Sequence, residues 1–198
     1  MECLIIVDLQ NDFLPGGSLA VAGGDEIIEP INQIQENYPL VIASQDWHPA
    51  GHMSFASSHK DHQVFDVISY QDMEQVLWPD HCVQGSEGAK FSPLLRNEKI
   101  ETIFRKGTDP KIDSYSAFFD NGRRKNTGLH GYLQDRGVKS LSIGGLAEDF
   151  CVYFTAMDGL DLGYEVNILS FASRAIDQQE NQVKLNEFQE RGGVVINR

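Results

Sequence analysis

The sequence has no long hydrophobic run. Its apolar segments all stay well below the roughly 20 residues that a membrane-spanning helix needs. The first of them, residues 4–7, is preceded by no basic residue and turns polar at Asp8, which is atypical of a signal peptide. We therefore expect neither a membrane span nor an export signal, and we interpret this run as a buried strand.

Cysteine and positive charge are also scarce. Cys3, Cys82 and Cys151 are widely spaced and odd in number, which predicts no disulfide framework and favours a reducing, cytoplasmic setting. The 16 Lys and Arg residues face 29 Asp and Glu residues, for a formal net charge of -13. Because phosphate binding needs clustered cations, this balance argues against a nucleic-acid partner and an anionic membrane surface. The oligomeric state stays open, since isolated apolar surface could support a homo-oligomer.

What the sequence does contain is an alternation of short apolar runs with longer helix-like stretches. The runs cover residues 4–7, 40–43, 102–104, 141–143, 165–169 and 194–196, and the stretches lie near 25–36, 125–135, 149–162 and 177–191. This order predicts a three-layer α/β/α fold with a six-stranded, mostly parallel sheet and a ligand site beyond the carboxyl ends of the strands. With 198 residues and no internal repeat, the chain is predicted to form one domain, 1–198.

Residues 45–99 interrupt this alternation. The segment is rich in His, Ser, Asp and Gly and has weak periodicity. A loop-rich insertion of this length is usually either functional or disordered. Its histidines and aromatic residues favour a functional insertion.

Cys151 follows the fourth apolar run in the order strand, glycine turn, helix start. The partial positive charge of a helix N-terminus lowers the pKa of a nearby thiol, and the backbone N–H groups of such a turn can face an oxyanion. The position therefore predicts a nucleophile, although most free cysteines are small buried hydrophobic residues.

Two charged residues follow other apolar runs. Asp8 ends the first run and Lys106 follows the third, so parallel strands would bring both to the same sheet edge as Cys151. There a carboxylate can act as the base for the thiol, and an ammonium can stabilise the thiolate. Taken singly, Asp8 also suits a capping role and Lys106 a solvated surface position.

The insertion carries a candidate metal site. Asp46 and His48 project to one side of an extended segment, and His81 follows further along. One carboxylate and two imidazoles suit Zn²⁺, Fe²⁺ or Mn²⁺, although turn hydrogen bonds would also explain the first pair. Three further histidines are alternative ligands: His52, His59 and His62.

Three aromatic residues could enclose a flat heterocycle, as an alternative to ordinary core packing: Phe13, Trp78 and Tyr115.

Five motifs, in order, resemble the nicotinamidases of the isochorismatase-like hydrolase superfamily. They are VDLQNDF at 7–13, QDWHP at 45–49, LWPDHCVQGS at 77–86, RKG at 105–107 and GGLAEDFCV at 144–152. The functional residues of these motifs run from Asp8 to Cys151, and the remainder of the chain, to Arg198, completes the fold without a motif of its own.

The resemblance implies a metal-dependent cysteine amidase that hydrolyses nicotinamide. It implies Asp8, Lys106 and Cys151 as the catalytic triad, and the N–H groups of Ala147 and Cys151 as the oxyanion site. It also implies a cis peptide bond between Leu146 and Ala147.

The same resemblance implies one divalent metal ion, zinc first, with iron or manganese as alternatives. Its ligands would be Asp46, His48 and His81. Ser54 lies where some relatives supply a further ligand, and a hydroxyl there would act through a water. The substrate would lie among the three aromatic residues, Phe13, Trp78 and Tyr115.

Other functions stay open at this stage. Isochorismatases lack the nucleophilic cysteine, but amidases of N-carbamoyl compounds or ureides keep an Asp-Lys-Cys triad, and pyrazinamide-type analogues are additional candidate substrates. The presence of both Asp-x-His at 46–48 and Trp-Pro-x-His-Cys at 78–82 favours nicotinamide as the substrate over these compounds. A ligand-binding protein with an inactive site is disfavoured by the intact triad. A redox sensor is disfavoured because Cys151 has no evident resolving cysteine.

Overall fold

A six-stranded sheet forms the centre of the protein, in a computed structural model that describes residues 1–197. The strand order is β5-β2-β1-β6-β7-β8, and every neighbouring pair is parallel. The strands are β1 (Glu2–Val7), β2 (Val41–Asp46), β5 (Ile100–Lys106), β6 (Ser140–Leu146), β7 (Glu165–Arg174) and β8 (Val194–Ile196). The six predicted strands are therefore confirmed, most of them with wider bounds.

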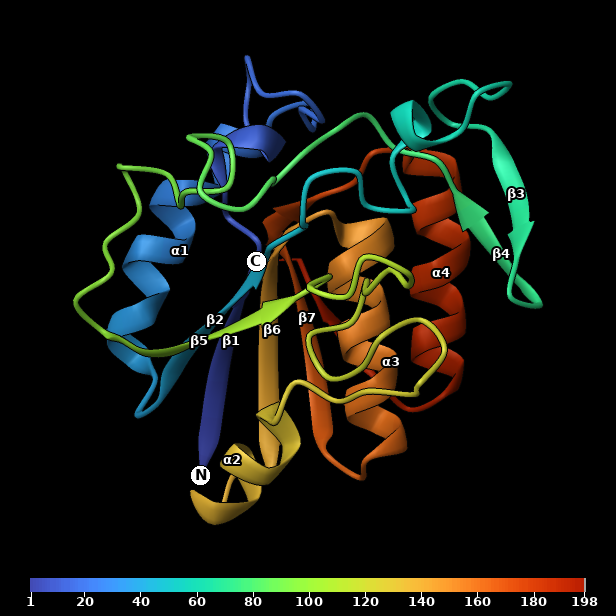
Figure 1. Cartoon of the computed structure of the whole chain (residues 1–198). Helices are drawn as coiled ribbons and strands as arrows, with labels where there is room; N and C mark the ends of the chain where they lie inside the picture. The colour runs from blue at the N-terminus through green and yellow to red at the C-terminus, as the bar shows by residue number, and fades with distance from the viewer. Residues whose placement is uncertain (198) are drawn as a thin grey trace.

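Helices cover both faces of this sheet (Figure 1). They are α1 (Ile28–Ile34) on one face, and α2 (Leu129–Asp135), α3 (Tyr153–Asp161) and α4 (Gln178–Glu190) on the other. Strand β1 explains the two layers, because Leu4 and Ile6 pack in the core under α1 whereas Ile5 and Val7 pack in the core under α3 and α4. A strand that is apolar on both sides needs a helical layer on each. The predicted three-layer arrangement is confirmed.

The helices are shorter than the sequence pattern predicts. Helix α2 begins at Leu129 instead of near 125, because Gly128, at φ 92°, still belongs to the preceding loop. Helix α1 is flanked by 3₁₀ turns at Gly24–Ile27 and Gln35–Asn37. Only α4 starts where expected. The Asp177 carboxylate caps this helix by accepting hydrogen bonds from the backbone N–H groups of Gln179 and Glu180.

The insertion is mostly irregular, as predicted, but it contains an antiparallel hairpin that the sequence pattern did not indicate. Strands β3 (Val67–Tyr70) and β4 (Met73–Val76) pair with each other outside the main sheet (Figure 1). The two turn residues, Gln71 at φ 51° and Asp72 at φ 65°, adopt the left-handed conformation that Asn-Gly usually supplies. The hairpin was missed because that signature is absent.

Four neighbouring strands end at the same edge of the sheet. Strand β5 ends at Lys106, β2 at Asp46, β1 directly before Asp8, and β6 directly before Ala147. Asp46 and Lys106 are register partners, so their side chains are neighbours by construction of the sheet. The candidate site therefore lies at the carboxyl end of the sheet. In the part of the chain that the structure describes, no helix has the length and apolarity needed to cross a membrane.

Gly145 allows β6 to approach β1 closely. Its φ is 137°, and a Cβ atom there would lie 2.1 Å from the Val7 carbonyl oxygen. We expect Gly145→Ala to lower the free energy of unfolding by about 3 kcal/mol, because the clash is with backbone. The control is Gly137→Ala, which has a positive φ of 67° but no atom within 4 Å of the added carbon, and should cost about 1 kcal/mol. If urea denaturation showed the same loss of unfolding free energy for both variants, this explanation would be contradicted.

Candidate active site

Lys106 is the centre of a buried cluster of charged groups. Its Nζ lies 2.9 Å from Asp8 Oδ2, 3.0 Å from Asp46 Oδ1 and 3.4 Å from Cys151 Sγ. It also donates a hydrogen bond of 2.9 Å to the Ser114 carbonyl oxygen. All of these residues are buried. The structure thus brings together the three residues of the predicted triad, from the position directly after β1, from the end of β5 and from the turn after β6.

The two carboxylates beside this ammonium differ in character. Burial opposes the charge on Lys106, but Asp46 and Asp8 outweigh it and raise its pKa well above the usual range. Burial also disfavours the Asp46 anion, yet His48 and Lys106 hold the pKa of Asp46 well below its ordinary value. For Asp8, burial dominates and raises the pKa, with Lys106 opposing it. Asp8 is therefore the carboxylate better suited to accept a proton.

Cys151 lies in a π-helical turn, Glu148–Val152, between β6 and α3. Burial raises the pKa of its thiol well above the ordinary value, and the positive charge of Lys106 opposes this only in part. The position of Cys151 at a helix start predicts a lowered thiol pKa. This direction is wrong, because burial raises the pKa in the folded protein. A neutral buried thiol needs a base before it can act as a nucleophile.

Asp8 is placed to be that base. Its Oδ1 accepts a hydrogen bond of 2.7 Å from Ser44, a buried residue of β2 that the sequence did not single out. Its Oδ2 forms an ion pair of 2.9 Å with the Lys106 ammonium. A carboxylate oxygen has two lone pairs, so Oδ2 can still accept the proton of the thiol.

Asp46, His48 and His81 converge beside the same cluster. Asp46 Oδ2 lies 3.0 Å from His48 Nε2 and 3.3 Å from His81 Nε2. The Nδ1 atoms lie 3.0 Å from the Gly107 carbonyl oxygen for His48 and 2.8 Å from that of Pro79 for His81. Because a carbonyl can only accept, each Nδ1 carries a proton, so each Nε2 is the ring nitrogen that faces Asp46 and that a metal ion would bind. This donor set fits a divalent zinc, iron or manganese ion.

His52, one of the alternative ligands, has both ring nitrogens in hydrogen bonds. His52 Nε2 lies 2.8 Å from the Asp109 carbonyl oxygen, so it donates, and His52 Nδ1 accepts the hydroxyl proton of Ser54 at 2.7 Å. The Ser54 oxygen is left as an acceptor, which agrees with a contact through water. Within residues 1–197, metal-ligand atoms converge in two groups, one of Asp46, His48 and His81 and one of His48, His52 and Asp113. His59 and His62 belong to neither group.

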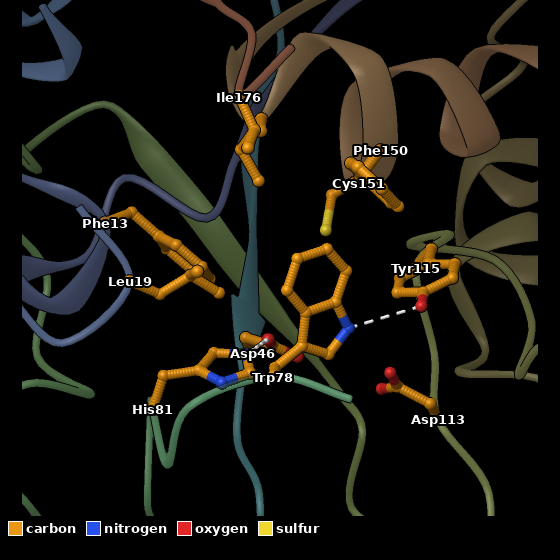
Figure 2. A pocket seen from close by; sticks show the side chains of 11 residues that line it. Phe13, Leu19, Asp46, Trp78, His81, Asp113, Tyr115, Phe150, Cys151 and Ile176 are labelled. Atoms are coloured by element: carbon orange, nitrogen blue, oxygen red, sulfur yellow. Dashed lines mark hydrogen bonds and ion pairs between the residues drawn. The ribbon is translucent and has the colours of Figure 1, made fainter. Parts of the chain in front are cut away.

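A pocket opens onto the thiol and the metal-ligand cluster (Figure 2). The predicted aromatic residues Phe13, Trp78 and Tyr115 all line it. Trp78 Nε1 donates to Tyr115 Oη at 3.2 Å, and Phe13 meets the His81 ring edge-on with 5.6 Å between ring centres. These flat walls suit a small planar ring.

Ala147 and Cys151, the predicted oxyanion residues, line the same pocket. The peptide bond between Leu146 and Ala147 is cis, which confirms the expectation from the resemblance.

Four lining residues were missed from the sequence: Leu19, Asp113, Phe150 and Ile176. Phe150 directly precedes Cys151, and its ring centre lies 4.9 Å from that of Trp78, so its motif position was a usable signal. Asp113 stands two residues before Tyr115, the same spacing that drew attention to Asp46 and His48. Leu19 and Ile176 lie in loops and carried no signal.

Comparisons with known proteins identify the family of this chain. An isochorismatase domain profile matches residues 2–198. The chain is 48% identical to the nicotinamidase of Escherichia coli over 182 residues, covering 90% of this chain and 85% of that one.

Two solved structures share the fold. The yeast nicotinamidase bound to the inhibitor nicotinaldehyde superposes with a TM-score of 0.96 at 30% identity, over 100% of both chains. The pyrazinamidase of Pyrococcus horikoshii in complex with zinc gives a TM-score of 0.81 at 35% identity, over 100% of this chain and 99% of that one. With the profile matching nearly the whole length, the chain belongs to the isochorismatase family.

Proposed function

We propose that this protein is a nicotinamidase, which hydrolyses nicotinamide to nicotinate and ammonia. The observation that carries the proposal is a pocket with aromatic walls that is lined by the Cys151 thiol and by Asp46 and His81 of the metal-ligand set. Asp8 lies behind this lining, joined to Cys151 and Asp46 through Lys106. The likeness to the nicotinamidase of E. coli and to the yeast enzyme that binds nicotinaldehyde supports the same substrate class.

One divalent metal ion belongs to this proposal, held by Asp46, His48 and His81. Zinc is the first choice, supported by the zinc complex of the Pyrococcus relative, with iron or manganese as alternatives. When bound, the ion would supply a Lewis acid for the pyridine nitrogen of the substrate. Ser54 would contribute its oxygen as an acceptor for water in this region.

The residues of the chain would carry the bond-making steps. Asp8 takes the proton of Cys151, and the sulfur attacks the carboxamide carbon while Lys106 stabilises the thiolate. The N–H groups of Ala147 and Cys151 stabilise the oxyanion. Asp8 returns the proton to the leaving nitrogen, the C–N bond breaks, and ammonia departs. Water, deprotonated by Asp8, then cleaves the thioester, releasing nicotinate and restoring the thiol.

The aromatic cage of Phe13, Trp78 and Tyr115 would orient the ring during these steps. The same walls suit another flat azine carboxamide such as pyrazinamide, and the Pyrococcus relative is a pyrazinamidase. They complement an acyclic ureide or N-carbamoyl compound less well, since such a substrate has no ring to stack.

We further propose that the product serves pyridine nucleotide synthesis by NAD salvage in the cytoplasm, and that residues 1–198 act as one domain. A homo-oligomer stays a prediction.

The nucleophile is tested with Cys151→Ala. Ammonia release from nicotinamide should fall by at least about 1000-fold, because the covalent route is lost, while the Kd for nicotinamide stays close to that of the wild type. Cys3→Ala removes another buried thiol, from β1, and should retain activity. Substantial turnover by the Cys151 variant would rule out this nucleophile.

Metal dependence is tested by chelation. Protein stripped of metal should lose ammonia release and tight nicotinamide binding, and Zn²⁺, Fe²⁺ or Mn²⁺ should restore both. Metal analysis of the stripped sample is the control. Full activity in demonstrably metal-free protein would remove Asp46, His48 and His81 from the mechanism.

The role of Lys106 is tested with Lys106→Met, read from the pH dependence of Cys151 alkylation. The ammonium lowers the pKa of the thiol, so its loss should raise that pKa further and move the alkylation profile to higher pH. The exposed Lys111→Met is the control and should leave the profile in place. A profile that stays fixed in the Lys106 variant would reduce this residue to a structural role.

A further inference from the structure

Asp113 is a buried acid that the proposed reaction does not use. It is 3% exposed and lines the pocket, yet no Lys, Arg or His nitrogen of residues 1–197 lies within 4.0 Å of its carboxylate. Its hydrogen-bond donors are both neutral: the Ser114 N–H at 2.7 Å and the Gln75 side-chain amide at 3.1 Å. Burying a carboxylate without an opposite charge is costly, so a cation is expected nearby in the working protein.

The metal site is the nearest place for such a cation. One carboxylate oxygen of Asp113 and one ring nitrogen each of His48 and His52 all lie within 4.8 Å of one another. His48 is also one of the three converging residues of the proposed metal site. Asp113 therefore stands beside that site without being one of its three ligands. Figure 2 shows its carboxylate at the Trp78 and Tyr115 side of the pocket, across from His81.

Gln75 holds this carboxylate in place. It lies on β4 of the hairpin and is 5% exposed. The two hydrogens of its amide nitrogen are shared among three acceptors: the Val76 carbonyl oxygen at 2.7 Å, Asp113 Oδ2 at 3.1 Å and Tyr115 Oη at 3.3 Å. The hairpin is thereby fastened to the pocket wall through one buried amide. The β3–β4 hairpin is separate from the main sheet, but through Gln75 it contacts two residues of the pocket wall.

We infer that Asp113 is an outer carboxylate of the metal site, which strengthens divalent-cation binding by its charge, and that Gln75 is its positioning residue. The inference rests on the proposed metal site formed by Asp46, His48 and His81. Partners outside the ligand set typically change metal affinity by about 10–100-fold.

The test measures the affinity of the full-length, metal-stripped protein for Zn²⁺ by competition with a chromophoric chelator. Asp113→Asn keeps the shape and removes the charge, and we expect the affinity to fall by about 10–100-fold. Asp109→Asn is the matched control. It lies in the same loop and makes the same change in net charge, but its side chain is 34% exposed and pairs with Lys125. It should bind Zn²⁺ like the wild type.

Gln75→Leu tests the positioning role of this residue. It also provides a second test of the inference if Asp113→Asn folds poorly. It leaves every charge and every metal ligand in place, so a merely structural hairpin contact would not alter Zn²⁺ affinity. We expect Gln75→Leu to lower the Zn²⁺ affinity, but by less than Asp113→Asn does. Gln71→Leu, in the same hairpin with an exposed amide, should bind Zn²⁺ like the wild type.

Asp46→Asn separates the inference from the metal site on which it rests. If Asp46→Asn loses Zn²⁺ while Asp113→Asn binds as the wild type does, the metal site stands and the inference is wrong. If Asp113→Asn binds as weakly as Asp46→Asn, Asp113 is a direct ligand and the outer role is wrong. If the wild type itself does not bind Zn²⁺, both the metal site and the inference fail.

Discussion

The contacts of the Lys106 ammonium with Asp8 and Asp46 constrain the whole site. A fully buried ammonium is unstable unless carboxylates surround it, and two buried carboxylates need a cation between them. Because the three residues come from three neighbouring strands, the ion cluster exists only in the observed register, with Asp46 opposite Lys106. The thiol joins the cluster because Gly145 lets β6 lie close against β1.

Backbone groups around this cluster decide the chemistry of the side chains. The carbonyl oxygens of Gly107 and Pro79 select the tautomers of His48 and His81, which turns two ordinary histidines into a converging donor pair. Gly107 has a second effect, since a Cβ atom there would lie 2.4 Å from His48 Cε1. The glycine that follows Lys106 therefore makes room for a metal-ligand residue, and the RKG motif serves both the triad and the metal site.

The sequence predicted the six strands well because their apolar runs are short and well separated, and those of the central strands β1, β2 and β6 are buried on both faces. The residues expected at the strand ends, Asp8, Lys106 and Cys151, do meet, since parallel strands end at one edge. The hairpin escaped prediction because Gln71 and Asp72 adopt positive φ without the residues that usually announce such a turn. The direction of the Cys151 pKa was also mispredicted, since burial is a property of the assembled core and not of the helix start.

By itself, the sequence determined the layered α/β architecture, the edge of the sheet that carries the site, and the residue types available there. It also supplied motifs that link the chain to its family. Only the tertiary structure decided which histidines converge on Asp46, that Asp8 and not Asp46 is the better proton acceptor, and that Asp113 and Gln75 lie at the pocket. The physical reason is that strand patterns are encoded locally, whereas burial, tautomer and charge partner depend on residues that are distant in the sequence.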